Sequence, residues 1–402
     1  MKKDKTQKSG YLRFSHRIVF FLVRVLSFLY TRLFLGYRCR AKYKIEKGES
    51  VLVLSNHQTD FDPFCIIPCF SKPVYPMATD NIFAGKFRSK FFSYCGVIPK
   101  KKGASDARSA VAMAKYLMAG SSVLLFSEGN RYYAEFQYYM TPTMAKFIKN
   151  TKITVVLFNL HGGNGVSPRF KNKNRKGKFY GEIKRVLKYE DYSNMSDDEL
   201  NAAIKDGIRV YDSDSGERYK SPLRAEYLER MLFACPVCGA FERLFSEGIH
   251  IKCKDCGLTV EYGEDLHLYS ENKDFVFTRL IDWWNYQKRA VREMEIGDGV
   301  IFSDSSARLF LTDPFQKRLL LAEGGVGIDR KTLFCGERSF ALADIERASV
   351  VSGRNLTFTA DGHDYTLRGG ERFNPLKYIF LLNKLETKMS LKKNDKYFAL
   401  EE

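Results

Sequence analysis

Between residues 51 and 185, short apolar runs alternate with stretches of helical character, and this alternation constrains the fold more than any other feature of the sequence. The apolar runs are VLVLS at 51–55, KPVYPMA at 72–78, SVLLF at 122–126 and ITVVLFNL at 153–160. A helix is predicted from about Ser105 to Gly120. Because strands and helices take turns along the chain, this region is expected to form an α/β domain.

Basic charge is concentrated in the N-terminal half of the chain. The sequence has 65 Lys and Arg against 47 Asp and Glu, a net charge of +18. Residues 1–230 hold 41 of the basic and 21 of the acidic residues, a balance of +20, so residues 231–402 carry −2. A positive surface attracts nucleic acid, anionic lipid or phosphorylated substrates. Charge alone does not distinguish these partners, so the motifs within the basic half are needed to choose among them.

The N-terminal apolar stretch RFSHRIVFFLVRVLSFLYTRLFLG is interrupted by Arg17, Arg24 and Arg32. No uncharged run in it approaches the roughly 20 residues that a membrane span needs. The arginine spacing puts these side chains broadly on one helical face, with apolar residues elsewhere. This pattern favours a helix over residues 1–38 that lies in the plane of a membrane, its arginines reaching the headgroups. A core-packing helix with a solvated basic stripe is the alternative, and the arginines argue against a secretory signal.

Polar residues with a histidine, NHQTDFD, follow the first apolar run directly. In α/β domains, catalytic groups collect at the carboxyl ends of strands. Asp62 can meet the imidazole of His57 after about one helical turn and hold one ring nitrogen as a donor, which leaves the other to accept a proton. Such an imidazole suits general base catalysis on a hydroxyl. A hydrogen-bonded surface histidine is the alternative, because His250 and Asp255 have the same spacing.

A second polar cluster, SEGNR, follows the run at 122–126 in the same way. Arginine can bind phosphate bidentately, and glycine allows close approach of the backbone. Between the clusters, GVIPKKKG places lysines after a short strand, where they can share a phosphate with Arg131. The candidate substrate-binding residues are Glu128, Gly129, Asn130, Arg131, Lys100 and Lys101. A surface turn with an ion pair, and a solvated lysine loop, are the alternatives.

The order of these motifs carries more information than any one of them. N-H-x4-D, G-x-I-P-K, F-x-E-G-x-R and a strand ending in HGG resemble the glycerolipid acyltransferase family, whose type member is 1-acylglycerol-3-phosphate acyltransferase, over roughly residues 40–190. The resemblance implies that His57 is the base, that Asp62 orients it, and that the second and third blocks bind the acceptor phosphate. Thr59, Ser127 and Asn130 differ from the residues common in the family, which can alter the acceptor.

The resemblance implies transfer of an acyl group from acyl-CoA or acyl carrier protein to a lysophospholipid hydroxyl, with 1-acylglycerol-3-phosphate giving phosphatidic acid as the first expectation. Acylation of another lysolipid or aminolipid hydroxyl, and a catalytically idle membrane scaffold, are the alternatives. The presence of all the motif residue types argues against idleness. The expected location is the cytoplasmic face of a membrane, as a peripheral or monotopic protein.

Two C-x-x-C pairs, CPVCG and CKDCG, are separated by 14 residues. Four thiolates with this spacing suit tetrahedral, structural Zn²⁺ in a zinc ribbon, and four free thiols or iron are the alternatives. The expected ligands are Cys235, Cys238, Cys253 and Cys256. Nucleic-acid binding is not expected, because residues 231–270 hold three basic and six acidic residues. The other cysteines, Cys39, Cys65, Cys69, Cys95 and Cys335, follow no pattern, which indicates unpaired thiols in a reducing compartment.

The C-terminal region has an amphipathic helix at 278–295, then many short apolar runs separated by turns, then a closing helix. Consecutive hairpins closed by one helix resemble a pleckstrin-homology-like or GRAM-like half-barrel, which could bind a protein or a lipid. The predicted division is an interfacial helix at 1–38, an acyltransferase domain at 39–190, a helical connector at 191–230, a zinc ribbon at 231–270, and a helix plus β domain at 271–402.

Overall fold

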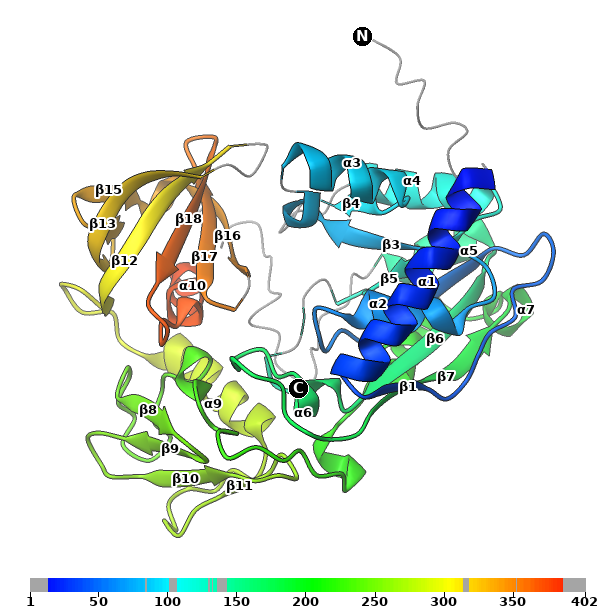
Figure 1. Cartoon of the computed structure of the whole chain (residues 1–402). Helices are drawn as coiled ribbons and strands as arrows, with labels where there is room; N and C mark the ends of the chain where they lie inside the picture. Colours follow the sequence, from blue (N-terminus) through cyan, green and yellow to red (C-terminus); the bar gives the residue numbers. More distant parts are fainter. Residues whose placement is uncertain are drawn as a thin grey trace. The chain divides into compact units, whose positions relative to one another are not determined.

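The computed structural model describes residues 14–83, 85–100, 107–128, 131, 133–135, 143–313, 318–351 and 353–385 (Figure 1). The chain divides into two compact units. Unit 1 consists of residues 1–168 and 176–217, and unit 2 of residues 169–175 and 218–402. The boundary at residue 217 falls inside the stretch that was interpreted as a connector, so the first part of that stretch belongs to unit 1.

A mixed sheet with the strand order β1-β7-β6-β2-β5-β3-β4 forms the centre of unit 1. Its strands are β1 Tyr37–Cys39, β2 Val51–Ser55, β3 Val74–Thr79, β4 Ile98–Lys100, β5 Ser122–Leu125, β6 Thr154–His161 and β7 Phe179–Leu187. From β6 to β4 the neighbours are parallel, whereas β7 runs antiparallel to β6. Every residue of β2 is buried, because helices cover both faces of a parallel sheet. The expected α/β domain is confirmed.

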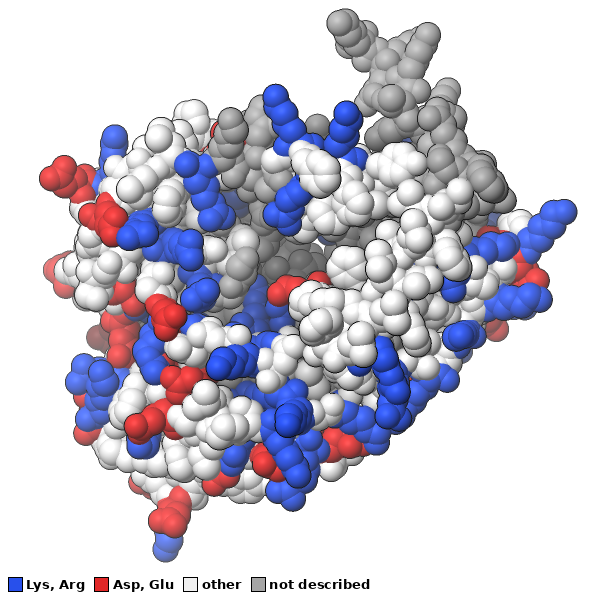
Figure 2. Space-filling view, viewed as in Figure 1, with Lys and Arg blue, Asp and Glu red and all other residues white. Residues whose placement is uncertain are grey.

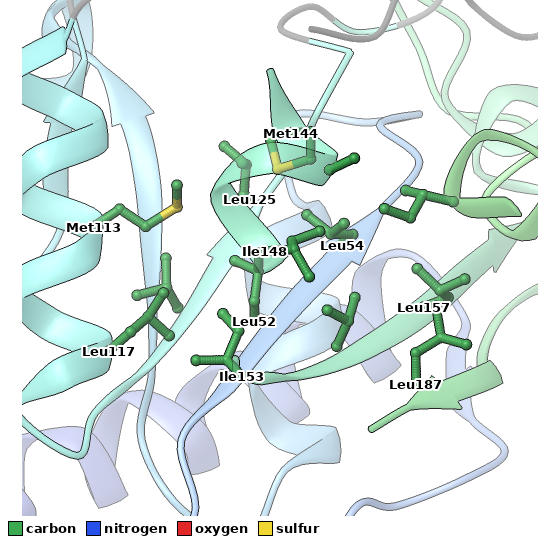
Figure 3. Packing of buried hydrophobic residues seen from close by; sticks show 14 of the residues in the cluster. Leu52, Leu54, Met113, Leu117, Leu125, Met144, Ile148, Ile153, Leu157 and Leu187 are labelled. Carbon is green, nitrogen blue, oxygen red and sulfur yellow. The ribbon is translucent and has the colours of Figure 1, made fainter. Parts of the chain in front are cut away.

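The helices of unit 1 are α1 Phe14–Phe34, α2 Asp62–Ile66, α3 Lys86–Tyr94, α4 Ala107–Met118, α5 Met144–Thr151, α6 Gly163–Val166, α7 Tyr189–Tyr192 and α8 Asp197–Gly207, with 3-10 turns at η2 Ile67–Cys69, η3 Asp80–Phe83 and η4 Ser213–Ser215. On one face of the sheet, Leu52 and Leu54 of β2 belong to the same buried cluster as Met113 of α4 and Ile148 of α5 (Figure 3). Ile204 of α8 joins this cluster. Residues 197–207 therefore form part of the core.

Helix α1 packs on α2 and η2 by a narrow line of side chains. That line includes Phe20, Ser27 and Thr31, all buried, and two of these three are polar. The exposed apolar side chains of the helix are Ile18, Phe21, Leu22, Val25, Leu26, Phe28, Leu29, Tyr30, Leu33 and Phe34. The outward face of α1 is thus more apolar than the inward face.

Arg24 of α1 does not point where the sequence pattern placed it. Its Nη1 donates to the carbonyl oxygen of Ser71 at 3.2 Å, and burial lowers its pKa. The arginine that was expected at the headgroups therefore faces the protein, because it lies on the same side of the helix as Ser27 and Thr31. Among the described residues, no helix has both the length and the apolar character that crossing a membrane requires.

Cys39 at the end of β1 and Cys69 at the end of η2 form a disulfide. The interpretation of all five cysteines outside the C-x-x-C pairs as unpaired is therefore wrong for these two. Thirty residues separate them in sequence, and only the packing of η2 beside β1 brings them together. Cys65, Cys95 and Cys335 are free.

Unit 2 contains two antiparallel sheets. The smaller, in the order β11-β10-β9-β8, holds the cysteine pairs, and the larger has the order β15-β14-β13-β12-β18-β17-β16. The elements are η5 Leu228–Arg230, β8 Leu244–Glu247, β9 His250–Cys253, β10 Thr259–Tyr262, β11 Leu268–Tyr269, α9 Leu280–Glu293, β12 Phe302–Thr312, β13 Arg318–Ile328, β14 Thr332–Cys335, β15 Arg338–Ala341, η6 Leu342–Asp344, β16 Ile345–Val351, β17 Asn355–Ala360, β18 His363–Gly369 and α10 Pro375–Lys384.

The cysteine-bearing and strand-rich parts of unit 2 share one core. The ring of Phe233 lies 5.7 Å from that of Phe302 and 5.6 Å from that of Phe380. The buried ammonium of Lys377 contacts Asp304 at 2.8 Å and also pairs with Glu242. Buried aromatic pairs and a partnered buried charge fix the two parts against each other.

Candidate active site

His57 and Asp62 form a close pair at the carboxyl end of β2. The His57 Nδ1 lies 2.8 Å from the Asp62 Oδ2, and the carboxylate is fully buried. The chain leaves β2, turns, and starts α2 at Asp62, with a proline in the first turn of that helix. Proline is favoured at this position, because its missing N–H would have no partner there. This early helix start brings residue 62 back toward residue 57.

The other contacts of Asp62 are all with donors. Its oxygens accept from the backbone N–H of Gln58 at 2.6 Å, from that of Thr59 at 2.9 and 3.0 Å, and from the Thr59 hydroxyl at 2.6 Å. A carboxylate surrounded in this way acts only as an acceptor, so the His57 Nδ1 must carry the hydrogen of their shared bond. The Nε2 of His57 is then the nitrogen that can accept a proton.

Phe126 and Glu128 hold His57 from the neighbouring strand. The ring of Phe126 stacks on the imidazole with centroids 4.1 Å apart and planes 17° apart. The backbone N–H of His57 donates to the Glu128 Oε2 at 3.2 Å, and Glu128 is buried. Both residues follow β5, which is paired with β2 in parallel, so the first and third sequence motifs meet at one edge of the sheet.

Arg131 contacts the loop that carries the histidine. Its Nε donates to the carbonyl oxygen of Gln58 at 3.1 Å, and its Nη2 donates to that of Ser167 at 3.1 Å. Its Nη1 pairs with the Asp60 Oδ2 at 2.7 Å. The Arg131 side chain is 13% exposed and that of Asp60 is 72% exposed. The guanidinium is therefore held beside the His57 loop by two carbonyls and pairs with the exposed acid Asp60.

A buried polar network supports this loop from below. The Asn56 amide bonds both ways to the backbone of Leu160, with 2.8 Å in each direction. The Gln58 Nε2 donates to the Asp212 Oδ2 at 3.1 Å, and the backbone N–H of Gly162 donates to the Asp212 Oδ1 at 2.7 Å. Burial raises the pKa of Asp212 to about 7, despite these donors. Asn56 therefore continues the β2–β6 pairing beyond the strand end.

Comparison of the sequence with protein families finds one match within unit 1. Residues 37–158 match the family model described as Acyltransferase. Over this region the chain is similar to the acyltransferase family. The matched residues run from β1 into β6 and include His57, Asp62 and Arg131, so the resemblance to the glycerolipid acyltransferases that the motif order indicated is confirmed.

Comparison with solved structures finds a partial similarity. The 1-acyl-sn-glycerophosphate (LPA) acyltransferase PlsC from Thermotoga maritima matches with a TM-score of 0.43 and 14% sequence identity, covering 50% of this chain and 82% of that one. No curated protein matches the sequence.

The remaining predicted substrate-binding residues divide into two groups. Lys100 is the last residue of β4, at the same carboxyl edge as His57 but three strand positions from β2, which is about 14 Å at the usual strand spacing. Lys101, Gly129 and Asn130 lie outside the described residues.

Phe126, Asp60 and Asp212 were missed by the sequence reasoning. Phe126 could have been found from its place directly before the acidic motif, whereas Asp212 carries no local signal.

The four C-x-x-C cysteines of unit 2 converge. Their sulfur atoms all lie within 4.8 Å of one another, with 3.7 Å between Cys235 and Cys256 and 3.8 Å between Cys238 and Cys253. A tetrahedral Zn²⁺ with bonds of about 2.3 Å places its sulfur ligands about 3.8 Å apart. The donor set and its spacing therefore fit zinc.

Proposed function

We propose that unit 1 transfers a fatty acyl group from acyl-CoA or acyl carrier protein to the free hydroxyl of a lysophospholipid. The acceptor we propose is 1-acylglycerol-3-phosphate, which would become phosphatidic acid. One observation carries the proposal: the His57–Asp62 pair lies beside Arg131, which binds the carbonyl of the residue after the histidine. A base and a fixed cation at one edge of a sheet suit a substrate that has a hydroxyl and a phosphate.

In the proposed reaction, the Nε2 of His57 removes the proton of the acceptor hydroxyl while the oxygen attacks the thioester carbonyl. The new C–O bond forms, the C–S bond breaks, and the proton passes from His57 to the departing thiolate. Asp62 keeps the imidazole in the required tautomer and stabilises its cationic form. The Phe126 ring and the Glu128 contact restrict the imidazole and its backbone, which lowers the entropy cost of orientation.

The Arg131 guanidinium is proposed to bind the acceptor phosphate. Its ion pair with Asp60 supports this role, because a carboxylate oxygen at 2.7 Å occupies the place that a phosphate oxygen would take. Asp60 is largely exposed and can turn into solvent at little cost. A dianionic phosphate would then replace a monoanionic carboxylate.

A membrane location follows from the substrate and from α1. The outward apolar face of α1 would lie in the interface of a bilayer, with the protein peripheral or monotopic at the cytoplasmic face, where both acyl donors are found. A helix with an apolar face whose apolar run is interrupted by arginines is typical of interfacial anchoring. The lysolipid would then reach the site from the same surface.

We also propose that the cysteine cluster holds one structural Zn²⁺ in a zinc ribbon, and that the sheet closed by α10 is a PH-like or GRAM-like domain with a protein or lipid partner. Zinc would hold the two cysteine turns together and so stabilise the small sheet. Elemental analysis of the purified protein should give about one zinc per chain. Cys238→Ser should lose the metal, Cys95→Ser should keep it, and retention by both would contradict the ligand set.

The acyltransferase proposal is tested with purified protein in vesicles, acyl-CoA or acyl carrier protein as donor, and a panel of lysolipids with and without phosphate. Wild-type protein should acylate the phosphorylated acceptor, His57→Ala should be inactive, and the matched His250→Ala should keep full activity. Arg131→Ala should raise KM for the phosphorylated acceptor far more than for an uncharged one. Equal losses would remove the phosphate role, and a preference for uncharged lysolipids or aminolipids would select that alternative.

A catalytically idle scaffold is the competing function. It predicts no product from any donor and acceptor pair, and no difference between wild-type protein and His57→Ala. The His57–Asp62 pair argues against it, because a fully buried carboxylate bonded to a partly exposed imidazole is the arrangement that a general base needs.

A further inference from the structure

Helix α3 of the acyltransferase unit has no buried residue. Its sequence is KFRSKFFSY, and the exposed fractions are 83% for Phe87, 46% for Phe91 and 50% for Tyr94. These aromatic residues are spaced four and three positions apart, so they form one stripe along the helix. Aromatic side chains lose most from contact with water, and an exposed apolar stripe marks a contact surface.

The opposite side of α3 is the side that attaches it to the domain. The Phe92 ring lies 6.1 Å from that of Phe83 in η3. Phe92 is half-buried and lies more than a quarter turn from the stripe on the helical wheel. The stripe of Phe87, Phe91 and Tyr94 therefore faces away from the anchoring contact.

Cations flank the aromatic stripe on both sides. Lys86 and Lys90 lie along one edge and Arg88 lies along the other, all three are exposed, and the helix contains no acidic residue. Figure 2 shows Lys and Arg side chains gathered around the place of α3 near the top of the view. Aromatic rings bordered by lysine and arginine match the interface of an anionic bilayer, where rings enter the headgroup region and cations meet phosphates.

The inward side of α1 and the end of the segment that carries α3 pack on the same residue of the sheet. Tyr75 of β3 contacts both helices: its ring lies 6.2 Å from that of Phe20 in α1, and Gly96 just after α3 packs against it so closely that a Cβ there would lie 2.6 Å from the ring. The two helices thus flank one residue of the same rigid sheet. Each helix also exposes apolar side chains to solvent.

We propose that α3 is a second membrane-contacting helix, which enters the interface of an anionic bilayer by Phe87, Phe91 and Tyr94 and binds lipid phosphates by Lys86, Arg88 and Lys90. A second contact fixes the rotation of the unit about the axis of α1, because one helix alone leaves that rotation free. The inference deepens the proposed function, since it sets the direction in which the catalytic edge meets the lipid. The bilayer is favoured over a protein partner because it accounts for both the rings and the apolar face of α1.

Vesicle flotation of the full-length protein tests the proposal without donor or turnover, so an inactive enzyme would not affect the result. The triple variant Phe87→Ser, Phe91→Ser, Tyr94→Ser should partition at least about ten-fold less than wild type. The control variant Leu223→Ser, Val276→Ser, Val300→Ser removes comparably exposed apolar side chains from unit 2 and should partition like wild type. Equal partitioning of both variants would overturn the proposal.

Charge is tested separately with Lys86→Gln, Arg88→Gln, Lys90→Gln. Each lost cation should weaken binding about five-fold on vesicles that contain phosphatidylglycerol. On pure phosphatidylcholine the variant should bind like wild type. On the anionic vesicles, binding of the variant should depend less on salt than binding of the wild-type protein. A similar loss on both vesicle types would overturn the phosphate contacts.

Quenching of tryptophan fluorescence by brominated lipids tests α3 separately from α1, because the introduced tryptophan lies on α3. The native Trp283 and Trp284 are buried in unit 2, with exposed fractions of 0% and 6%, so a new tryptophan on α3 reports its own surroundings. Brominated lipids should quench Phe91→Trp and leave Val276→Trp unquenched. Absence of quenching at position 91 would overturn the proposal. A charge variant that binds vesicles normally but loses rate only with acyl carrier protein as donor would also overturn it, and would assign α3 to that acidic protein.

Discussion

Histidine precedes aspartate by five positions twice in this chain, at His57–Asp62 in unit 1 and at His250–Asp255 in unit 2. In unit 1 the pair is joined by a hydrogen bond of 2.8 Å, and the acid is buried. In unit 2 the Asp255 carboxylate pairs instead with Arg243 at 2.6 Å, while His250 opens the antiparallel strand β9. The same spacing therefore produces two unrelated environments.

The difference lies in what the chain does after the histidine. After His57 it turns into α2, which brings residue 62 back within reach. After His250 it stays extended as far as Cys253, and an extended strand advances about 3.3 Å per residue. The acid is thereby carried away from the histidine. A spacing predicts a pair of side chains only when the intervening backbone is known to turn.

The largest expected effect comes from replacing each of the two acids by asparagine, which tests whether only the first pair is catalytic. Asp62→Asn should lower kcat by about 10² to 10⁴, because an asparagine amide would hold the imidazole in the wrong tautomer. Asp255→Asn should leave the steady-state rate unchanged. If both substitutions cost the same activity, the two pairs would not differ in function.

A smaller effect is expected from the ring that stacks on the imidazole. Phe126→Leu keeps an apolar side chain but removes a stacking contact of about 1 kcal/mol, so kcat should fall about two- to ten-fold with little change in KM. Phe245→Leu, in the unit that contains His250, is the matched control. An altered KM with normal kcat would show that Phe126 contacts the substrate instead of positioning the base.

A third prediction concerns Asp60, which lies in the turn between His57 and Asp62. The chain after His250 is a strand and has no such turn. Asp60→Asn removes a competitor for Arg131, so KM for a phosphorylated acceptor should fall by at most about five-fold, the value of an exposed ion pair. KM for an uncharged lysolipid should not change. A rise in KM for the phosphorylated acceptor would mean that Asp60 orients Arg131 for binding.

The smallest expected effect is on the pH dependence of stability, through the buried Asp212 that bonds to Gln58. Because burial raises the pKa of Asp212 from 3.8 to about 7, the folded state keeps its proton to higher pH than the unfolded state. The stability from this group is full below about pH 4 and is lost as pH rises through about 7. Asp212→Asn should therefore show a smaller fall in Tm between pH 5 and 8 than wild type, as measured by thermal unfolding. Parallel curves for the two proteins would contradict the shift.

The sequence predicted correctly those strands and helices that have a clear apolar run or a clear apolar period of their own. The run at 51–55 is β2 residue for residue, because a strand buried on both faces must be continuously apolar. The helix expected at 278–295 is α9, and its amphipathic period reflects one buried side. The C-terminal apolar runs do not each correspond to one strand: residues 302–303 and 307–312 both belong to β12, and the polar residues between them coincide with an irregularity in the pairing with β13.

The sequence by itself determined the chemical groups of the candidate sites: a histidine and an acid within one turn, an arginine at the end of the third motif, and four cysteines in two C-x-x-C pairs. These depend on neighbours along the chain, so spacing and residue type suffice. Only the tertiary structure decided that Phe126 covers the imidazole, that Asp212 supports Gln58 from 154 residues away, and that α1 and α3 turn their apolar sides outward. Such features depend on which surfaces the sheet leaves open, and a helical period cannot show which of its faces the domain will cover.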